Sequence, residues 1–390
     1  MSLKTRLSVL LISTPVLAFV LVGGLMGKQP DADQTFQHLR VFEDVVSLVL
    51  NNYVEDVKVD RVMDGAMRGL ADGLDPDSAY LDAKQVRALE AGETLPDGDV
   101  GLQLTRQYWL RVVATRDGSP AAKLGLQTGD YVRAIDGKST RDMSVFEGSR
   151  MLRGQPGSKV TLTIIRGNAV DPHEISLVRE KPEGPLVSSR MIGQDAGYAR
   201  VVAFSDGIAD ELRKHAEDLA KNGAKALIID VRRTAEGPLE NGIAAARMFV
   251  KSGTLVIKAG RGKDSMRESI TARAGDGLVE LPVTLLVTTG TSGAAELFAA
   301  ALEGNNRAEL VGERTLGRAG IQKLVKLPEN RGLWLTYARY LTPAGASIQG
   351  RGLEPDVQVD EPEVEFGAPA PTEDAILEAA IERLKTKRAA

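Results

Sequence analysis

The sequence predicts an α+β multidomain protein with an N-terminal membrane helix, a helical region, a β-rich module and an α/β core that has a mostly parallel sheet. Three observations carry this prediction. An uncharged segment lies near the N-terminus, short strands punctuated by glycine begin at Asp99, and strands alternate with helices after Gly197. The chain has 390 residues, and such a length favours about two or three domains.

The composition narrows the class of protein. Hydrophobic residues make up 43% and charged residues 26% of the chain, as in folded domains. With a net charge of −4 and only 4% aromatic residues, the chain lacks the basic, stacking surface of a nucleic-acid-binding protein. The absence of cysteine excludes disulfides, thiol nucleophiles and thiolate metal sites. His38, His173 and His215 show no metal-ligand spacing. We therefore expect no cofactor, no metal and no nucleic acid.

The first residues predict a membrane anchor. Lys4 and Arg6 precede Leu7–Met26, a run of 20 residues without a charge, which is long enough to span a bilayer as a helix. The run exceeds the apolar region of a typical signal peptide, and no A-x-A cleavage site follows. The preceding positive charges place the N-terminus in the cytoplasm and the remainder outside. We expect an uncleaved signal anchor, with a cleaved signal peptide as the alternative.

The residue pattern changes from helical to β-rich in the middle of the chain. Residues 1–33 form the predicted anchor and spacer, and residues 34–95 form a helical region in which apolar residues recur at helical spacing. Residues 96–181 contain short alternating runs between glycines, which are typical of strands. The predicted strands are 111–115, 131–137 and 159–167, with short helices at 119–125 and 145–154. This region is therefore predicted to be a compact β-rich module.

The second half of the chain predicts an α/β core at residues 182–365. Apolar strands alternate with helices there, a pattern typical of a parallel sheet that is covered on both faces. The expected strands are 198–204, 226–231, 254–259 and 283–287, with helices at 207–222, 242–250 and from about 294. Residues 323–343 predict a hairpin, and residues 366–390 predict a linker and a C-terminal helix that begins at Asp374.

A strand, a turn with hydroxyl groups and a helix follow one another near residue 290. The apolar run 281–287 leads into TTGTSGAAELFAAALEG, residues 288–304. Many hydrolases present a nucleophile at such a turn, where the helix N-terminus stabilises negative charge that develops on the substrate. Ser292 is the hydroxyl considered for this role. The competing interpretation is that Ser292 or Thr291 caps the helix.

Several segments along the chain have sequences typical of one protein family, and they occur in the same order as in that family. They read ADGLDPDSAYL at 71–81, GSPAAKLGLQTGDYVRAIDG at 118–137 and RYLTPAGASIQGRGLEPDVQV at 339–359. These segments resemble the carboxyl-terminal processing peptidases, also called tail-specific proteases. The first is similar to the family's LDPHSxYL signature and the last to its TPSGRSIQGxGIEPDV segment. The resemblance implies that residues 96–181 are a PDZ domain, that residues 182–365 are a peptidase-like core, and that the protein lies in a bacterial cell envelope, anchored in the inner membrane with its bulk in the periplasm or outside.

The PDZ interpretation also has a physical basis. The segment DVGLQL is a glycine turn that opens a strand edge, where backbone amides can receive a peptide carboxylate while the peptide adds as a strand. The amides concerned are those of Val100, Gly101, Leu102, Gln103 and Leu104. The facing helix is expected near 144–152. The alternative is a β-module that packs only against its neighbours.

The resemblance also fixes where a catalytic dyad would lie. Family members use a serine three residues before a glutamate, and a lysine twenty-five residues later in GKGxxQ, whose glutamine supports the lysine. In this chain the glutamate is Glu296, so the nucleophile position is Gly293. The second motif reads GRAGIQ, which places Arg318 at the general-base position and Gln322 at the supporting position. Glycine has no atom that attacks a carbonyl, and arginine does not deprotonate in proteins.

A third departure concerns the loop that supplies an oxyanion-stabilising amide. The family's DLRNNPGG corresponds to DVRRTAEGPL at 230–239, with Glu236 at the first glycine and Gly237 after it. A carboxylate at this place opposes developing negative charge unless it points away. Pro238 also removes an amide donor nearby.

These departures predict a catalytically degenerate member of a serine endopeptidase family. We expect it to bind protein or peptide C-termini through the PDZ domain, as a scaffold, an adaptor or a regulator of proteolysis. The alternative is an active serine endopeptidase that cleaves proteins near their C-termini with Ser292. Further expected partners are the membrane, through Leu7–Met26, and an active peptidase homologue or a second copy of the chain.

Overall fold

The computed structural model describes residues 32–167, 171–261, 267–362, 364–368 and 371–389. The predicted anchor at Leu7–Met26 lies outside these residues. Within the described ranges, no helix has both the length and the apolar character needed to cross a membrane. The chain divides into two compact units at the Met67–Arg68 bond.

The first unit is helical, as the spacing of its apolar residues predicts. It contains α2 (Ala32–Asn52) and the beginning of α3 (Val59–Asp72). Asp60 lies in the first turn of α3, where a carboxylate interacts favourably with the positive end of the helix dipole. The helical prediction is confirmed for these residues.

The second unit begins with a short strand and a capped helix. Strand β1 (Ala79–Leu81) precedes α4 (Ala83–Glu90), and Asp82 between them is the N-cap of the helix. Asp82 Oδ1 accepts hydrogen bonds from the amides of Lys84 and Gln85, and Gln85 Oε1 accepts one from the amide of Asp82. This reciprocal arrangement is a capping box. The region predicted as helical therefore also supplies a strand, which pairs with β16 near the end of the core.

The β-rich module contains a sheet and two short helices, as predicted, and the sheet is antiparallel. Its sheet order is β2-β3-β4-β6-β7, so β2 is an edge strand, and β5 pairs with β4. Helices α5 and α6 are capped by the hydroxyls of Ser119 and Ser144. The strands are β2 (Leu102–Gln107), β3 (Trp109–Thr115), β4 (Tyr131–Ile135), β5 (Lys138–Ser139), β6 (Lys159–Ile165) and β7 (His173–Val178), and the helices are α5 (Pro120–Lys123) and α6 (Val145–Leu152). Helix α6 packs against β2.

The core contains the predicted parallel sheet. Its order is β17-β14-β13-β10-β9-β8, and every pair is parallel except β8 with β9. The central strands are buried along their length, as expected for strands that are covered on both faces. The strands are β8 (Val187–Ile192), β9 (Ala196–Val201), β10 (Ala226–Asp230), β13 (Val283–Val287), β14 (Ala308–Gly312) and β17 (Val357–Gln358).

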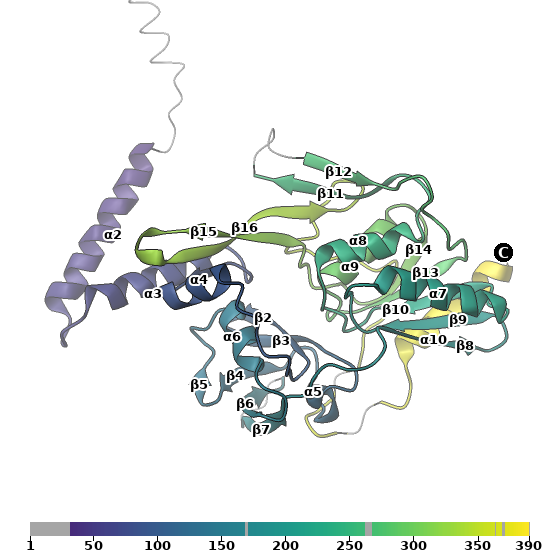
Figure 1. Cartoon of the computed structure of the whole chain (residues 1–390), viewed down its shortest axis with the longest axis horizontal. Helices are drawn as coiled ribbons and strands as arrows, with labels where there is room; N and C mark the ends of the chain where they lie inside the picture. The colour runs from purple at the N-terminus through teal and green to yellow at the C-terminus, as the bar shows by residue number, and fades with distance from the viewer. Residues whose placement is uncertain (1–31, 168–170, 262–266, 363, 369–370, 390) are drawn as a thin grey trace, which may run out of the picture. The chain divides into compact units, whose positions relative to one another are not determined.

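Helices cover both faces of this sheet (Figure 1). Alternate residues of β10 show the division, because Leu227 and Ile229 pack with α7, α8 and α9, whereas Ile228 packs with α10. Helices α8 and α9 approach closely, since a Cβ on Gly242 would lie 2.0 Å from Ala294 O. The helices are α7 (Ile208–Lys221), α8 (Leu239–Arg247), α9 (Ala294–Glu303) and α10 (Ala375–Ala389).

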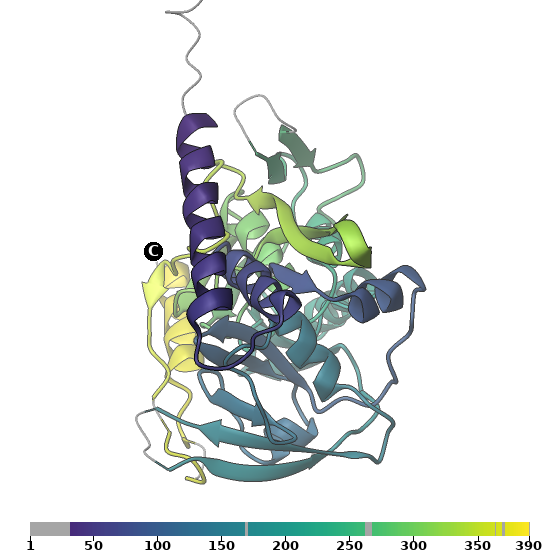
Figure 2. The same ribbon diagram turned by 90° about the vertical axis from the view of Figure 1, so that its left-hand side faces the viewer.

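A second, antiparallel sheet differs from the prediction for residues 254–259. These residues are apolar like the core strands, and they were expected in the parallel sheet. They form β11 (Thr254–Gly260), which pairs antiparallel with β12 (Arg267–Thr271) and with β16 (Gly332–Leu341). A short apolar run does not identify its sheet. The predicted hairpin is confirmed as β15 (Gly320–Lys326) with β16, the light-green strands of Figures 1 and 2, joined through the 3₁₀ helix η1 (Pro328–Asn330).

Candidate active site

The turn between β13 and α9 is held to the neighbouring loop 231–234 by backbone and hydroxyl groups. Thr291 Oγ1 donates to Val231 O at 2.9 Å and accepts from the amide of Thr288 at 3.1 Å. The amide of Ser292 donates to Thr234 O at 3.0 Å. The turn is therefore fixed at two successive residues immediately before Gly293.

Gly293 has the backbone of a strained nucleophile turn. Its φ and ψ are 65° and −120°, a conformation that side-chain-bearing residues rarely adopt except where the fold imposes strain. A Cβ built on Gly293 would lie 3.7 Å from Leu239 Cδ2 and 4.0 Å from Arg318 O, which are ordinary contact distances. The fold thus leaves room for a side chain at this position, and the chain places none there.

Ser292 is neither a helix cap nor an accessible hydroxyl. It is 1% exposed, and its Oγ has no hydrogen-bond partner among the described residues. The N-cap of α9 is Gly293, which has no side chain of its own to bond the first amides of the helix. Since Thr291 Oγ1 is directed to Val231 and Thr288, the expectation that Ser292 or Thr291 caps the helix is wrong. Thr291 and Ser292 thus bond to the neighbouring loop 231–234, not to the first amides of the helix.

Glu296 joins the turn to the loop that carries Arg318. Its carboxylate accepts from the amides of Gly293, Gly317 and Arg318 at 3.1, 2.6 and 2.7 Å, and from the hydroxyl of Thr315. The side chain is fully buried, and this burial raises the pKa of the Glu296 carboxyl above its ordinary value, although all four donors oppose the rise. Glu296 therefore fixes the two candidate dyad positions relative to each other.

Arg318 is engaged by two partners. Its Nη2 lies 2.7 Å from Asp77 Oδ1, an ion pair without the alignment of a hydrogen bond. Its Nη1 donates to the backbone oxygen of Leu104, on β2 of the β-rich module, at 3.3 Å. The Asp77 side chain is only 6% exposed, so the guanidinium supplies its countercharge.

Asp77 was missed in the sequence analysis, although a signal for it exists. The signature LDPHSxYL has histidine where this chain has Asp77. The turn around it is rigid, because Asp75 Oδ1 accepts from the amides of Asp77 and Ser78 at 2.9 and 2.8 Å. Two departures from the family pattern, at 77 and at 318, thus meet as an ion pair. Comparing the signature letter by letter finds the departure at Asp77, and the structure shows its pairing with Arg318.

Gln322 lies on β15 and is directed at a different group. Its Nε2 donates to Thr336 Oγ1 at 3.1 Å, and Thr336 Oγ1 in turn donates to Asp75 Oδ1 at 3.2 Å. The side chain therefore supports the turn that carries Asp77. The resemblance had implied that it supports the residue at 318 directly.

Glu236 points to the β-rich module. Its Oε2 accepts from Arg116 Nε at 2.8 Å and from Arg116 Nη2, and its backbone oxygen accepts from the amide of Phe204 at 2.8 Å. Gly237 has φ +119°, and a Cβ there would lie 2.2 Å from Phe204 O. The loop is consequently held against residue 204, with its carboxylate neutralised by an arginine.

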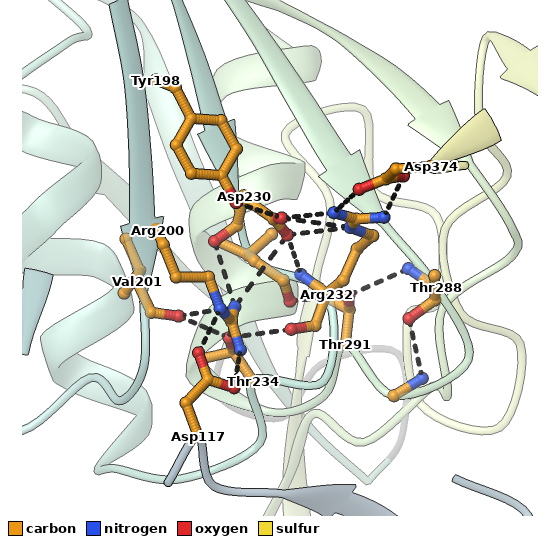
Figure 3. Close-up of polar contacts among 12 residues, drawn as sticks. Asp117, Tyr198, Arg200, Val201, Asp230, Arg232, Thr234, Thr288, Thr291 and Asp374 are labelled. Carbon is orange, nitrogen blue, oxygen red and sulfur yellow. Dashed lines mark hydrogen bonds and ion pairs between the residues drawn. The ribbon is translucent and has the colours of Figure 1, made fainter. Parts of the chain in front are cut away.

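A largely buried polar network includes Arg232 and Thr234 of the same loop (Figure 3). Arg200 Nη1 donates to Thr234 Oγ1 at 2.9 Å, while Asp117 Oδ2 accepts from Arg200 Nε at 2.8 Å. Arg232 binds Asp230 and also Asp374, immediately before α10. Burial opposes the ionisation of Asp230, but the hydrogen bonds and charge of Arg232, together with the charge of Arg200, hold the pKa of that carboxyl below its usual value. The network joins the β-rich module, the core sheet and the C-terminal helix.

The glycine turn of the β-rich module offers fewer amides to a peptide carboxylate than the sequence suggested. Asp99 Oδ1 accepts from the amides of Val100 and Gly101 at 2.6 and 3.1 Å. Of the five amides, only those of Leu102, Gln103 and Leu104 are not bonded to Asp99, and this segment also pairs with β3 along its inner edge. Strand β2 lies at the edge of its sheet with α6 packed against it, and an edge strand can accept an added peptide strand.

The comparisons with known proteins agree with this architecture. Residues 195–359 match peptidase family S41, residues 111–166 match the PDZ domain, and residues 23–85 match the N-terminal domain of the activating protease CtpB.

Full-length relatives extend the match over most of the chain. The carboxy-terminal-processing protease of Bartonella bacilliformis is 32% identical over 333 residues, which cover 84% of this chain and 76% of that protein. The corresponding protease of Synechocystis sp. is 33% identical, over 90% of this chain and 83% of its own length. Among solved structures, the photosystem II D1 C-terminal processing protease superimposes with a TM-score of 0.68 at 28% identity, covering 80% of this chain and 85% of the other. The chain therefore belongs to peptidase family S41 and, within it, to the carboxy-terminal processing proteases.

Proposed function

We propose that this chain is a catalytically degenerate carboxy-terminal processing protease. In this proposal it is anchored in the bacterial inner membrane through Leu7–Met26, binds protein or peptide C-termini through its PDZ domain, and acts as a scaffold, an adaptor or a regulator of proteolysis. The observation that carries the proposal is Gly293, whose backbone has the strained conformation of a nucleophile turn and whose surroundings leave room for the side chain that it lacks.

The second support is the state of the residue at the base position. A general base must give up a proton near neutral pH, which a buried lysine can do and an arginine cannot. Arg318 forms an ion pair with Asp77. Acyl transfer also needs an accessible hydroxyl, and Ser292, the alternative nucleophile, is 1% exposed. Hydrolysis through Ser292 is thus the weaker alternative.

Peptide binding is supported by the PDZ domain itself. Strand β2 has an unpaired edge in its sheet, and Leu102 to Leu104 retain amides that Asp99 does not occupy. A peptide that adds to this edge gains main-chain hydrogen bonds, and its terminal carboxylate distinguishes it from an internal segment. This chemistry favours free C-termini as ligands.

Restoring the family's residues tests the catalytic part. We expect the full-length chain to leave an unfolded substrate with an apolar C-terminus intact, and the triple variant Gly293→Ser, Arg318→Lys, Asp77→His to cleave it. The matched control carries Ala at 293 with the other two changes. It places a side chain on the same strained backbone but has no hydroxyl to act as nucleophile. Cleavage by the unaltered chain that disappears in Ser292→Ala would establish the alternative function instead.

The binding part is tested with paired peptides. A labelled apolar peptide with a free carboxylate should bind at least tenfold more tightly than the same peptide with an amidated end. Equal affinity for the two peptides would count against recognition of C-termini by this domain.

A further inference from the structure

We propose that the PDZ domain carries a second binding surface, which docks on the phosphate groups of an anionic lipid bilayer. Three aromatic and three arginine side chains on and beside β3 and β4 make up this surface, which we call the arginine–aromatic cluster: Tyr108, Trp109, Tyr131, Arg111, Arg133 and Arg141. The cluster is separate from the strand edge proposed for peptides and from the predicted anchor. The inference therefore goes beyond the proposed function and does not depend on peptide binding or on loss of catalysis.

The cluster is continuous across the neighbouring strands β3 and β4. The guanidinium of Arg111 lies over the ring of Tyr131, with 5.7 Å from Cζ to the ring centroid, and Tyr131 meets Trp109 edge to face with centroids 6.1 Å apart. Arg133 lies over the ring of Trp109 at 5.0 Å. A guanidinium over an aromatic face is attracted by the negative charge of that face. The rings therefore hold the arginines in place.

Tyr108 stands at the tip of the β2–β3 hairpin in a strained backbone conformation. It is the single residue between the two strands, because Gln107 pairs with Trp109, and its φ is +69°. A bulky residue rarely adopts a positive φ. Tyr108 is nevertheless 59% exposed, with the guanidinium of Arg141 over its ring at 5.0 Å. The chain thus keeps an exposed ring where glycine would relieve the strain, and such strain is typical of functional sites.

The charge of the domain favours an anionic partner. Within the part of the chain that the structure describes, Arg111, Arg133 and Arg141 form no ion pair with a carboxylate. Residues 96–181 contain 13 Lys and Arg residues against 10 Asp and Glu residues, a net charge of +3 in a chain whose net charge is −4. A basic domain within an acidic chain indicates attraction to a negatively charged surface.

The mixture of aromatic and cationic groups favours a bilayer over a soluble acidic protein. Trp and Tyr are enriched at membrane–water interfaces, where their amphipathic rings lie at the level of the headgroups. Arginine near anionic lipid is attracted to the surface, and its guanidinium can bind a phosphate through two nitrogens. In the cluster the two kinds of group touch each other, so both can meet the headgroups together. An anchored chain also keeps its PDZ domain near a bilayer, so a weak affinity is sufficient.

One exposed carboxylate beside the cluster opposes docking. Arg141 borders a hollow of about 400 Å³ whose walls include Asp72, Asp75 and Asp142. Asp72 is paired with Arg106, and Asp75 accepts hydrogen bonds from backbone amides of its own turn. Asp142 is exposed and has no cationic partner among the described residues. Removing the charge of Asp142 should therefore strengthen docking.

The two tryptophans of the chain provide a direct test. Trp334 lies on β16, so Trp334→Phe leaves Trp109 as the single tryptophan and keeps a ring beside Phe146. The full-length Trp334→Phe chain is combined with vesicles of brominated phosphatidylcholine, with or without brominated phosphatidylglycerol. Bromine should quench Trp109 in the anionic vesicles only, and high salt should reverse the quenching because it screens the charges.

Charge variants in the Trp334→Phe chain test the arginines. Arg133→Gln with Arg141→Gln should lower the ratio of docked to free domains about twenty-five-fold, since each arginine at an anionic surface contributes about fivefold. Asp142→Asn should raise the ratio about fivefold. The matched control, Lys123→Gln with Lys159→Gln, removes two exposed charges of the same domain outside the cluster and should change the ratio less than about twofold.

Tyr108→Gly separates docking from folding. Glycine adopts φ +69° without strain, so the variant should unfold at the same temperature as the Trp334→Phe chain or at a higher one. Loss of the exposed ring should still lower the docked fraction. Undiminished docking in this variant would show that the ring is not part of the surface, and the proposal would be wrong.

Three other results would overturn the proposal. They are equal quenching in neutral and anionic vesicles, quenching that survives the double arginine variant, and an equal loss in the lysine control. A shift of Trp109 emission with soluble polyglutamate and none with anionic vesicles would assign the cluster to acidic protein segments instead. Failure of the proposed peptide binding would leave the docking result unaffected, because quenching of Trp109 needs no peptide.

Discussion

Two glycine turns, at Gly101 in the PDZ domain and at Gly293 in the core, are built alike. Their φ values are +76° and +65°, and a buried carboxylate accepts from each glycine amide at 3.1 Å, Asp99 in the first turn and Glu296 in the second. The surroundings differ. A Cβ on Gly101 would lie 2.2 Å from Ser119 Cβ, whereas a Cβ on Gly293 has no neighbour closer than 3.7 Å. Packing requires the first glycine, and only backbone conformation favours the second.

The largest expected effect comes from Gly101→Ala. The new methyl group overlaps Ser119 and the backbone is strained, so the free energy of unfolding should fall by about 3 to 4 kcal/mol. The control is Gly118→Ala in the same module, which has φ +72° and no atom within 4 Å of a built Cβ. It should lose about 1 kcal/mol. Urea denaturation measures both values, and equal losses would refute the steric distinction.

An intermediate effect is expected from Glu296→Gln. The amide group of glutamine presents a donor to backbone donors, which should lower the free energy of unfolding by about 2 to 3 kcal/mol. The variant also changes the pH dependence. Because burial raises the folded-state pKa of Glu296 above its ordinary value of 4.5, the folded state binds the proton more tightly than the unfolded state does.

The sign of that pH dependence is testable. The stabilisation from protonated Glu296 is complete below about pH 4.5 and is lost as the pH rises through the folded-state pKa. The original chain should therefore lose stability relative to Glu296→Gln over this interval. Denaturation curves at a series of pH values would show it, and a difference that grows with pH would mean that the carboxyl has a lowered pKa.

The smallest effect is expected from Gly293→Ala. With room for the methyl group, the change should lower the free energy of unfolding by only about 1 to 2 kcal/mol, from backbone strain. Thermal unfolding should rank it below Gly101→Ala. A loss as large as that of Gly101→Ala would show that the turn no longer has space for a side chain, and it would remove the structural basis for restoring serine at 293.

Local pattern predicted most of the architecture, and long-range contacts account for the rest. The buried strands at 226–230 and 283–287 and the two short helices of the PDZ domain follow from periodicity, turns and caps. Strand β11 is as apolar as these strands, so composition alone could not assign it to the antiparallel sheet.

The candidate site was also predicted only in part. Spacing from Glu296 located Gly293 and Arg318, and the structure joins both positions through that carboxylate. The partners of Arg318 and Glu236 could not be inferred from spacing, because Asp77 and Arg116 lie far away in sequence and no periodicity connects them. The prediction that Ser292 caps α9 is wrong for a related reason, because its amide bonds to Thr234 in the loop that follows β10.

The ion pair between Arg232 and Asp374 has a consequence for biosynthesis. Arg232 belongs to the loop that ends at Glu236, and Asp374 directly precedes α10, the helix that covers the second face of the core sheet. Synthesis proceeds from the N-terminus, so every strand of the core sheet is made before α10. Until then, Ile228 and its neighbours lack their cover and Arg232 lacks its second carboxylate. The face of the core sheet that α10 covers and the ion pairs of Arg232 are therefore completed after the strands of that sheet and after the PDZ domain.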